Sequence, residues 1–178
     1  MEKSKAGTQL DGDTLYQRQV ARRKTGEDVA GPTVVAFGLK SSQNVGAVLR
    51  LADAAGCTRV IFVHEGEYTP RKIRKTSRHA HAIVEWQECP PDAFPDLIPS
   101  LPPLVALELT TQSTSVFDTA LRSPITLVVG SERNGIPETI LAQCQQAVHI
   151  PMFGVNGSMN VTHALGIALF EWRRQQNA

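Results

Sequence analysis

The chain has 178 residues, of which 42% are hydrophobic and 20% charged, and its formal net charge is +1. These values are typical of a single globular domain with a substantial core, and the net charge does not by itself indicate nucleic-acid binding. No apolar run reaches the roughly 18 residues that a membrane span needs. The polar start MEKSKAGTQLDGD also lacks the apolar segment of a signal peptide. We therefore expect a cytoplasmic protein without a membrane segment.

The three cysteines, Cys57, Cys89 and Cys144, are odd in number and show no CxxC spacing. This pattern predicts neither a disulfide framework nor a zinc site, and free thiols are typical of a reducing cytosol. The five histidines also lack metal-ligand spacing with nearby carboxylates. We expect no metal.

Residues 1–30 are polar and have weak periodicity, so we expect an N-terminal arm that is helical from Leu15 to Arg23 at most. The arm is either a solvated tail or a basic segment that contacts the substrate. Its basic cluster consists of Arg18, Arg22, Arg23 and Lys24.

From Pro32 onward, strand-like and helix-like segments alternate, and we expect one domain over residues 31–178. The expected strands are Thr33 to Gly38, Arg59 to His64, Ile83 to Trp86, Leu104 to Leu109, Ile125 to Val129 and Ala147 to Ile150. The expected helices are Asn44 to Gly56, Ala93 to Ile98, Ile136 to Gln143 and Ser158 to Arg174. Such alternation predicts an α/β fold with a mostly parallel sheet flanked by helices on both faces.

A strongly basic stretch, RKIRKTSRHAH from Arg71 to His81, follows the second expected strand. It is either a solvated loop or a surface that contacts phosphate groups. Its five charges within eight residues are Arg71, Lys72, Arg74, Lys75 and Arg78.

In parallel α/β sheets, ligands bind beyond the carboxyl ends of the strands, and three unusual segments lie at such ends. The first is NVGAVLR, from Asn44 to Arg50. Asn44 is suited to cap the helix, and Gly46 lies one turn before Arg50 on the same face. Because glycine within a helix costs about 1 kcal/mol relative to alanine, we expect Gly46 to clear space in front of Arg50. Taken alone, Arg50 is more typical of a solvated helix face.

The second segment is GSERNG, in which Gly130 and Gly135 bracket Glu132. Two glycines so close together predict a turn with exposed backbone donors. The nucleotide-binding patterns GxGxxG and GxxxxGK[ST] are absent from the sequence, which disfavours ordinary dinucleotide or P-loop binding.

The third segment, HIPMFGVNGSMNV, runs from His149 to Val161. Pro151 ends a strand, glycines follow, and Ser158 is a good candidate for the N-cap of the last helix. Such a loop leaves backbone N–H and C=O groups free, so it suits a small ligand that is held by main-chain atoms. Ser158 and Asn160 would lie at its mouth.

Together the three segments fit the patterns N-x-G-x-x-x-R, G-x-E-x-x-G and I-P-M-x-G-x-x-x-S-L-N-V, the last with one substitution. In this order and spacing they resemble the three motifs of the SpoU (TrmH-type) branch of the SPOUT RNA methyltransferases. The resemblance extends from about Pro32 to the C-terminus. It implies a homodimer whose C-terminal segment forms a deep trefoil knot, which general folding rules would not predict.

The resemblance also implies a function: transfer of a methyl group from S-adenosylmethionine to a ribose 2′-oxygen of RNA. The implied cofactor contacts, largely through backbone atoms, are Gly130, Ile150 and Met159, with Leu109 as a weaker fourth. Arg50 would be the catalytic residue. The rest of the implied catalytic constellation consists of Asn44, Glu132, Ser158 and Asn160.

Two positions depart from the family pattern. Met159 replaces the usual leucine, a volume-conserving change, and His79 stands where relatives typically have glycine. With an RNA-modifying site on the chain, we expect the stretch from Arg71 to Arg78 to contact phosphate. A tRNA substrate is slightly favoured over ribosomal RNA.

Two other classes of protein remain as alternatives. One is a non-catalytic RNA-binding protein of the same fold. The other is a flavodoxin-like nucleotide- or flavin-binding protein, which the missing phosphate-binding motif disfavours.

Overall fold

The structure is a computed structural model of the chain, and it describes residues 7–25 and 30–176. A seven-stranded sheet, with strand order β3-β2-β1-β6-β4-β7-β5, forms its centre. All its strand pairs are parallel, as the sequence predicts. The strands are β1 (Gly31–Phe37), β2 (Cys57–Val63), β3 (Glu85–Cys89), β4 (Leu104–Leu107), β5 (Thr114–Ser115), β6 (Thr126–Val129) and β7 (Gln146–His149).

Strand β1 lies where the direction of winding reverses. The chain passes from β1 to β2 and β3 on one side, and the later strands are added on the other side of β1. Val34 accordingly pairs with Val60 of β2 and with Leu127 of β6. In parallel sheets, the crevice at such a reversal is a preferred ligand site.

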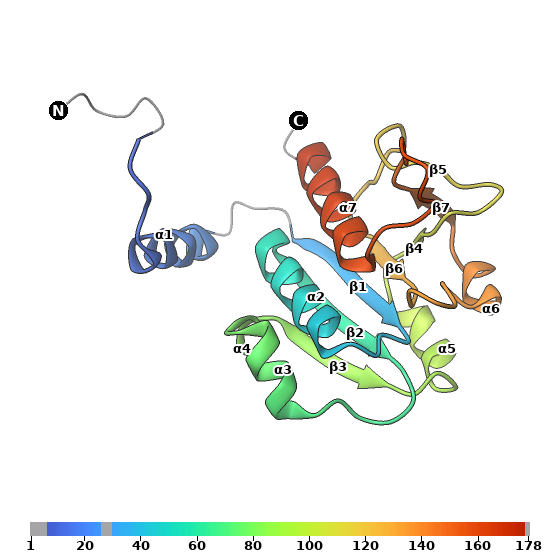
Figure 1. The fold of residues 1–178 in the computed structure, drawn as a ribbon, viewed down its shortest axis with the longest axis horizontal. Coiled ribbons are helices and arrows are strands. Elements are labelled where there is room, and N and C mark those ends of the chain that lie inside the picture. Colours follow the sequence, from blue (N-terminus) through green and yellow to red (C-terminus); the bar gives the residue numbers. More distant parts are fainter. Residues whose placement is uncertain (1–6, 26–29, 177–178) are drawn as a thin grey trace.

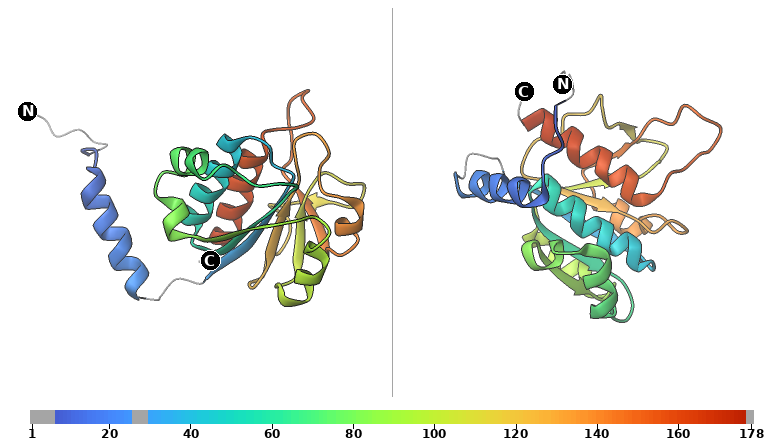
Figure 2. Two further views of the ribbon diagram at one scale, coloured as in Figure 1. Left: turned by 90° about the horizontal axis from the view of Figure 1, so that it is seen from below. Right: turned by 60° about the vertical axis from the view of Figure 1, so that its left-hand side comes forward.

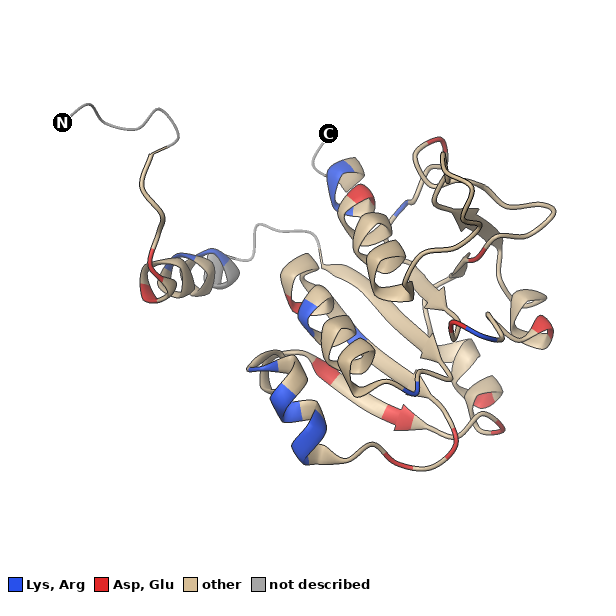
Figure 3. Ribbon diagram, viewed as in Figure 1, with Lys and Arg blue, Asp and Glu red and all other residues tan. Residues whose placement is uncertain are grey.

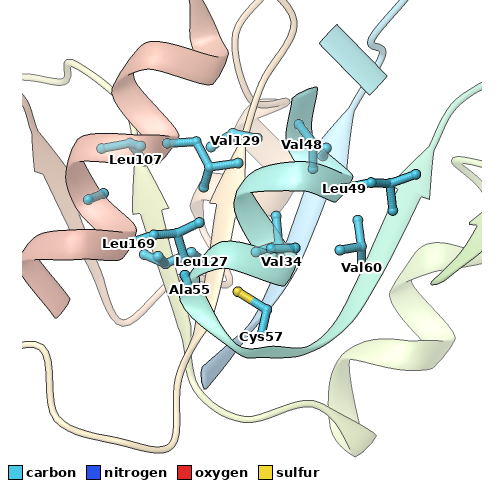
Figure 4. Packing of buried hydrophobic residues seen from close by; sticks show 14 of the residues in the cluster. Val34, Val48, Leu49, Ala55, Cys57, Val60, Leu107, Leu127, Val129 and Leu169 are labelled. Atoms are coloured by element: carbon cyan, nitrogen blue, oxygen red, sulfur yellow. The ribbon is translucent and has the colours of Figure 1, made fainter. Parts of the chain in front are cut away.

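Alternating residues of the strands face the two layers of helices that cover the sheet (Figures 1 and 2). Val34 and Ala36 face a core built with helices α2, α3, α4 and α7 (Figure 4), whereas Val35 and Phe37 face α5 and α6. The helices are α2 (Ser42–Ala55), α3 (Pro70–Ser77), α4 (Ala80–Ile83), α5 (Phe94–Leu97), α6 (Glu138–Leu141) and α7 (Val161–Gln176), with a short 3₁₀ turn at Ile98–Ser100.

The last helix begins later than the sequence predicts. The expected start at Ser158 is wrong: α7 begins at Val161, and Ser158 lies in the exposed loop before it. Asn160 is the residue that caps α7, because its Oδ1 accepts hydrogen bonds from the Thr162 N–H (2.8 Å) and the Thr162 hydroxyl (2.7 Å). Both Ser158 and Asn160 are good capping residues, and the packing of the chain decides between them.

Strands β3 and β5 also differ from the prediction. Strand β3 begins at Glu85 and ends at Cys89, so the expected strand at Ile83 to Trp86 is too early. The short strand β5 pairs with the end of β7 and is not predicted from the sequence. Two paired residues are too few to give a periodic signal.

The basic stretch forms a helix rather than a loop. Helix α3 starts at Pro70, which is suited to the first helical position. Ile73 and Ser77 are buried beneath it, while the charged side chains are exposed. At its C-terminal end, Arg78 adopts φ 54°, a conformation that is unusual for a residue other than glycine.

The N-terminal helix α1 (Gly12–Thr25) is longer than expected and stands apart from the sheet (Figures 1 and 2). Asp11 caps it by accepting a hydrogen bond from the Thr14 N–H at 2.9 Å. The rest of the predicted arm, residues 1–6 and 26–29, lies outside the described residues. Within the described part of the chain, no helix combines the length and apolar character needed to cross a membrane.

Candidate active site

A cavity of about 600 Å³ lies over the carboxyl ends of the adjacent strands β6, β4 and β7. Its size is typical of sites for small ligands. All four residues expected to contact a cofactor line it, together with two of the expected catalytic residues. These six residues are Leu109, Gly130, Ile150, Met159, Glu132 and Ser158.

Two glycines allow the loop after β6 to fold tightly against the cavity. A Cβ atom at Gly130 would lie 2.0 Å from the carbonyl carbon of Gly135, so no larger residue fits there. Gly135 has φ +63°, and a Cβ atom there would lie 2.7 Å from Oε2 of Glu108. The two glycines of GSERNG therefore define one wall of the cavity.

Glu108, which the sequence patterns did not single out, holds this wall in place. Its Oε2 accepts a hydrogen bond from the Ile136 N–H at 3.1 Å, and its Oε1 accepts one from the Leu109 N–H at 3.1 Å. The carboxylate thus joins the end of β4 to the loop after β6. The signal that could have revealed it is a single acidic residue inside the otherwise apolar expected strand Leu104 to Leu109.

Three of the expected catalytic residues form a hydrogen-bonded chain beside the cavity. Asn160 Nδ2 donates to Asn44 Oδ1 at 3.3 Å, and Asn44 Nδ2 donates to the Glu132 carboxylate. This chain links the N-terminal ends of α7 and α2 to the loop after β6. Asn44 therefore acts in a tertiary contact, and no side-chain hydrogen bond caps α2.

Arg50 does not join these residues. It is exposed on α2, is not among the residues lining the cavity, and makes no side-chain hydrogen bond or ion pair with any described residue. The expected role of Gly46 is also wrong. A Cβ atom at Gly46 would lie 2.3 Å from Oγ1 of Thr76, so this glycine allows close packing of α2 on α3 and does not clear space for Arg50.

The cavity carries more negative than positive charge. Three carboxylates, Glu108, Glu132 and Glu138, line it against one guanidinium, that of Arg133. His149 also lines the cavity, and its Nδ1 atom lies 3.0 Å from the hydroxyl oxygen of Ser113. The wall is thus suited to a ligand with net positive charge.

The five basic residues expected to contact RNA lie outside this cavity. Arg71, Lys72, Arg74 and Lys75 are exposed on α3, and Arg78 is exposed just after it. Figure 3 shows the positive charge gathered along this helix. The structure therefore separates these residues from the cavity of about 600 Å³ over β6, β4 and β7, hereafter the cofactor-type cavity.

The cysteines are free thiols. Burial raises the pKa of Cys57 to about 12 and that of Cys144 to about 11, so both are protonated near neutral pH. No cluster of metal-binding side chains occurs within residues 7–25 and 30–176.

The fold and cavity define an α/β protein with a ligand-sized cavity formed by the loops after three adjacent parallel strands. The sequence model of the SpoU rRNA methylase family matches residues 31–170. The chain belongs to this family. The knot that the resemblance implies stays a prediction.

Relatives with known names include enzymes for two kinds of RNA. The chain is 31% identical over 157 residues to the 23S rRNA (guanosine-2′-O-)-methyltransferase of Blochmanniella floridana, covering 86% of the chain and 61% of that protein. It is 29% identical over 146 residues to the tRNA (guanosine(18)-2′-O)-methyltransferase of Aquifex aeolicus, covering 80% and 69%.

The structural comparison agrees with the family assignment. The AdoMet-bound rRNA methyltransferase from Sinorhizobium meliloti matches with a TM-score of 0.73 and 26% identity. The match covers 81% of this chain and 56% of that one. The chain thus spans little more than half the length of this relative.

Proposed function

We propose that the chain is an S-adenosylmethionine-dependent methyltransferase that acts on a ribose 2′-hydroxyl of RNA. The observation that carries the proposal is the cavity of about 600 Å³, which the GSERNG and IPMFGVNGSMNV loops line. S-adenosylmethionine carries a sulfonium and an ammonium group against one carboxylate. Its net positive charge complements the three carboxylates and single guanidinium of the cavity.

The residues present fit this cofactor. Gly130, Ile150 and Met159 would hold it largely through the backbone, and Leu109 would add an apolar contact. When bound, the cofactor supplies an electrophilic methyl group. The contribution of the chain is mainly to position the ribose oxygen for in-line attack, which by itself supplies several kcal/mol.

The proton of the 2′-hydroxyl requires a further group. A guanidinium resists deprotonation because its pKa is above about 12. Arg50 would therefore act in one of two ways. Beside a phosphate group or in a buried environment, it would serve as a transient base. Otherwise it would stay charged and stabilise the developing alkoxide while water takes the proton. In both roles, Arg50→Ala and Arg50→Lys lose turnover while cofactor binding is retained.

The position of Arg50 supports a homodimer as part of this proposal. Because Arg50 is absent from the cavity of its own chain, a second copy would complete the site. Phe170 of α7, which packs against α2, is 51% exposed and offers an apolar contact for that copy. Phe170→Glu should convert a dimer to a monomer in light scattering coupled to size-exclusion chromatography. A parent chain that is already monomeric would contradict this part of the proposal.

RNA binding is assigned to the exposed basic face of α3. Removing one charge that binds a phosphate should lower the slope of log K against log salt by about 0.7–0.9. Lys72→Ala with Lys75→Ala removes two such charges, so the double variant should flatten the salt dependence by about twice that amount. The matched change Arg122→Ala, in the exposed segment before β6, should leave the slope unchanged. An unchanged slope in the double variant would mean that the basic residues of α3 are solvated and do not contact phosphate.

The decisive experiment measures methyl transfer from labelled S-adenosylmethionine into RNA that lacks this modification, separated into tRNA and ribosomal fractions. The expected result is label in one fraction that is absent with Arg50→Ala. A tRNA substrate remains slightly favoured, and a cytoplasmic location is part of the same proposal. Cofactor binding without label in either fraction would favour a non-catalytic RNA-binding protein. A protein that neither binds S-adenosylmethionine nor labels RNA would overturn the proposal.

A further inference from the structure

A second cavity, of about 540 Å³, lies beyond the carboxyl ends of β1 and β2. It is separate from the cofactor-type cavity, but the two share Ser131, Asn134 and Gly135. They therefore lie on opposite sides of one turn. The second cavity also borders the point where the sheet reverses its winding, between β1 and β6, which is where parallel sheets commonly bind ligands.

The loops around this cavity are tied to one another before any ligand arrives. The Tyr68 hydroxyl donates to the carbonyl oxygen of Leu39 at 2.7 Å and so joins the loop after β2 to the loop after β1. The Gly38 N–H donates to the Val63 carbonyl at 2.8 Å across the same pair of strands. Such hydrogen bonds lower the entropic cost of ordering the loops when a ligand binds.

A partly buried polar network supports one wall. His64, whose side chain is 9% exposed, lies with Nε2 2.8 Å from Oε2 of Glu88, which also accepts a hydrogen bond from the Tyr68 N–H at 2.9 Å. The rings of His64 and Tyr68 stack with 3.9 Å between their centroids. The methyl-transfer chemistry proposed above uses none of these groups.

We propose that the second cavity binds a nucleobase of the RNA substrate. Phe37, Pro91 and Pro137 provide apolar surface that suits the flat faces of a base. Lys40, Glu67 and Asn134 provide a donor, an acceptor and an amide with both. A base that has left its stack presents these two kinds of surface, and RNA-binding proteins commonly recognise it in this way.

The position of the cavity supports this ligand. The loop that forms its wall, residues 64–68, leads directly into α3, where the basic residues would bind the phosphate chain. The shared turn separates it from the cofactor-type cavity, at which the ribose would react. An RNA strand that crosses α3 therefore reaches this cavity and the cofactor-type cavity together. This inference rests on the proposed function for its RNA substrate.

The test fills the cavity and measures RNA affinity rather than catalysis. Glu67 is exposed and lines only the second cavity, so Glu67→Trp adds bulk at its mouth without touching the core. The matched control is Asp118→Trp, an exposed acidic residue that lines neither cavity. Both full-length variants are compared with the parent for S-adenosylmethionine affinity and for binding of the tRNA and ribosomal fractions at one salt concentration.

We expect Glu67→Trp to weaken binding of the preferred RNA at least fivefold relative to Asp118→Trp, with cofactor affinity unchanged in both. Ultraviolet cross-linking of the parent should also attach nucleotides to the peptides that contain Lys40 and Tyr68. The proposal is overturned if RNA affinity of Glu67→Trp stays within twofold of the control. Because this readout needs no turnover, a parent that binds RNA without methylating it would overturn the proposed function and leave the base site standing.

Discussion

Asn44 and Glu132, which are 88 residues apart, meet through a hydrogen bond from the asparagine Nδ2 to the glutamate carboxylate. Asn44 is 8% exposed and lies in the first turn of α2, whereas Glu132 lies in the loop after β6. Asn160 extends the contact to the start of α7. One amide thus fixes the position of the loop that separates the two cavities.

Asn44→Asp tests this contact directly. The change removes the Nδ2 donor and places a second carboxylate against Glu132, which should cost about 1–3 kcal/mol. Because Glu132 lines the cofactor-type cavity, we expect the affinity for S-adenosylmethionine to fall about 10- to 100-fold in calorimetric titration.

Gln43→Glu is the control for this prediction. Gln43 is the preceding residue of α2, it is exposed, and its Oε1 serves only as an acceptor for the Ser41 hydroxyl. The affinity of the Gln43→Glu variant for S-adenosylmethionine should stay within twofold of that of the parent. Equal losses in both variants would mean that added negative charge near α2, and not the Asn44–Glu132 contact, weakens binding.

Gly46→Ala should destabilise the fold although alanine is the better helix former. The added Cβ would lie 2.3 Å from Oγ1 and 2.6 Å from the carbonyl carbon of Thr76, so α2 and α3 would have to separate. Overpacking of this kind costs about 1–3 kcal/mol, more than the gain of about 1 kcal/mol in helix propensity. Urea unfolding should show a lower free energy of unfolding.

Gly166→Ala in α7 is the matched control. Its Cβ would lie 3.2 Å from Cδ2 of Leu51, the flexible end of a side chain that can move. The free energy of unfolding should therefore stay within about 1 kcal/mol of the parent. A Gly46→Ala protein as stable as Gly166→Ala would show that the close approach of the two helices is not required.

Much of the fold could be predicted because its central strands, such as β1 and β6, are buried on both faces and rich in β-branched residues. TVVAF and TLVV, for example, are predicted as strands, and they lie in the centre of the sheet. Helix α3 could not be predicted as easily, because charged residues cover most of it and only Ile73 and Ser77 are buried. Helical periodicity needs more apolar positions than that to be recognised.

The candidate site shows a similar division. Motif spacing led to the loops that form the cavity, since Gly130, Ile150 and Met159 follow strands and line the same space. Contacts between distant segments were not accessible from spacing. The bond from Glu108 to the Ile136 N–H and the approach of Gly46 to Thr76 depend on how whole elements pack.

Glu108→Gln should weaken cofactor binding by loosening the wall of the cavity. A glutamine keeps only one acceptor oxygen, so either the Ile136 N–H or the Leu109 N–H loses its partner. Water can satisfy the exposed Leu109 N–H, whereas a partly buried Ile136 N–H without its partner costs about 1–3 kcal/mol. This cost corresponds to a roughly 5- to 150-fold loss of S-adenosylmethionine affinity.

The matched change Glu138→Gln removes the same charge from the same cavity. Glu138 is exposed and lies at the start of α6. It should therefore reduce affinity only through electrostatics, within about threefold at physiological salt. If the two variants lost affinity equally, charge and not the hydrogen bonds of Glu108 would determine binding.

Arg78→Gly should separate stability from RNA binding. Arg78 has φ 54° at the end of α3, a conformation that costs a residue with a side chain about 1–3 kcal/mol. Glycine relieves this strain, and after its larger loss of backbone entropy we expect a gain of about 1 kcal/mol in the free energy of unfolding. Arg74→Gly, inside the same helix, should instead lose about 1 kcal/mol.

Both variants lose one charge, so both should lower the salt slope of RNA binding by about 0.7–0.9. Opposite shifts in urea unfolding with equal shifts in salt slope are the expected result. A stability loss in Arg78→Gly would show that the arginine side chain supports the fold, and an unchanged salt slope would remove Arg78 from the RNA-binding surface.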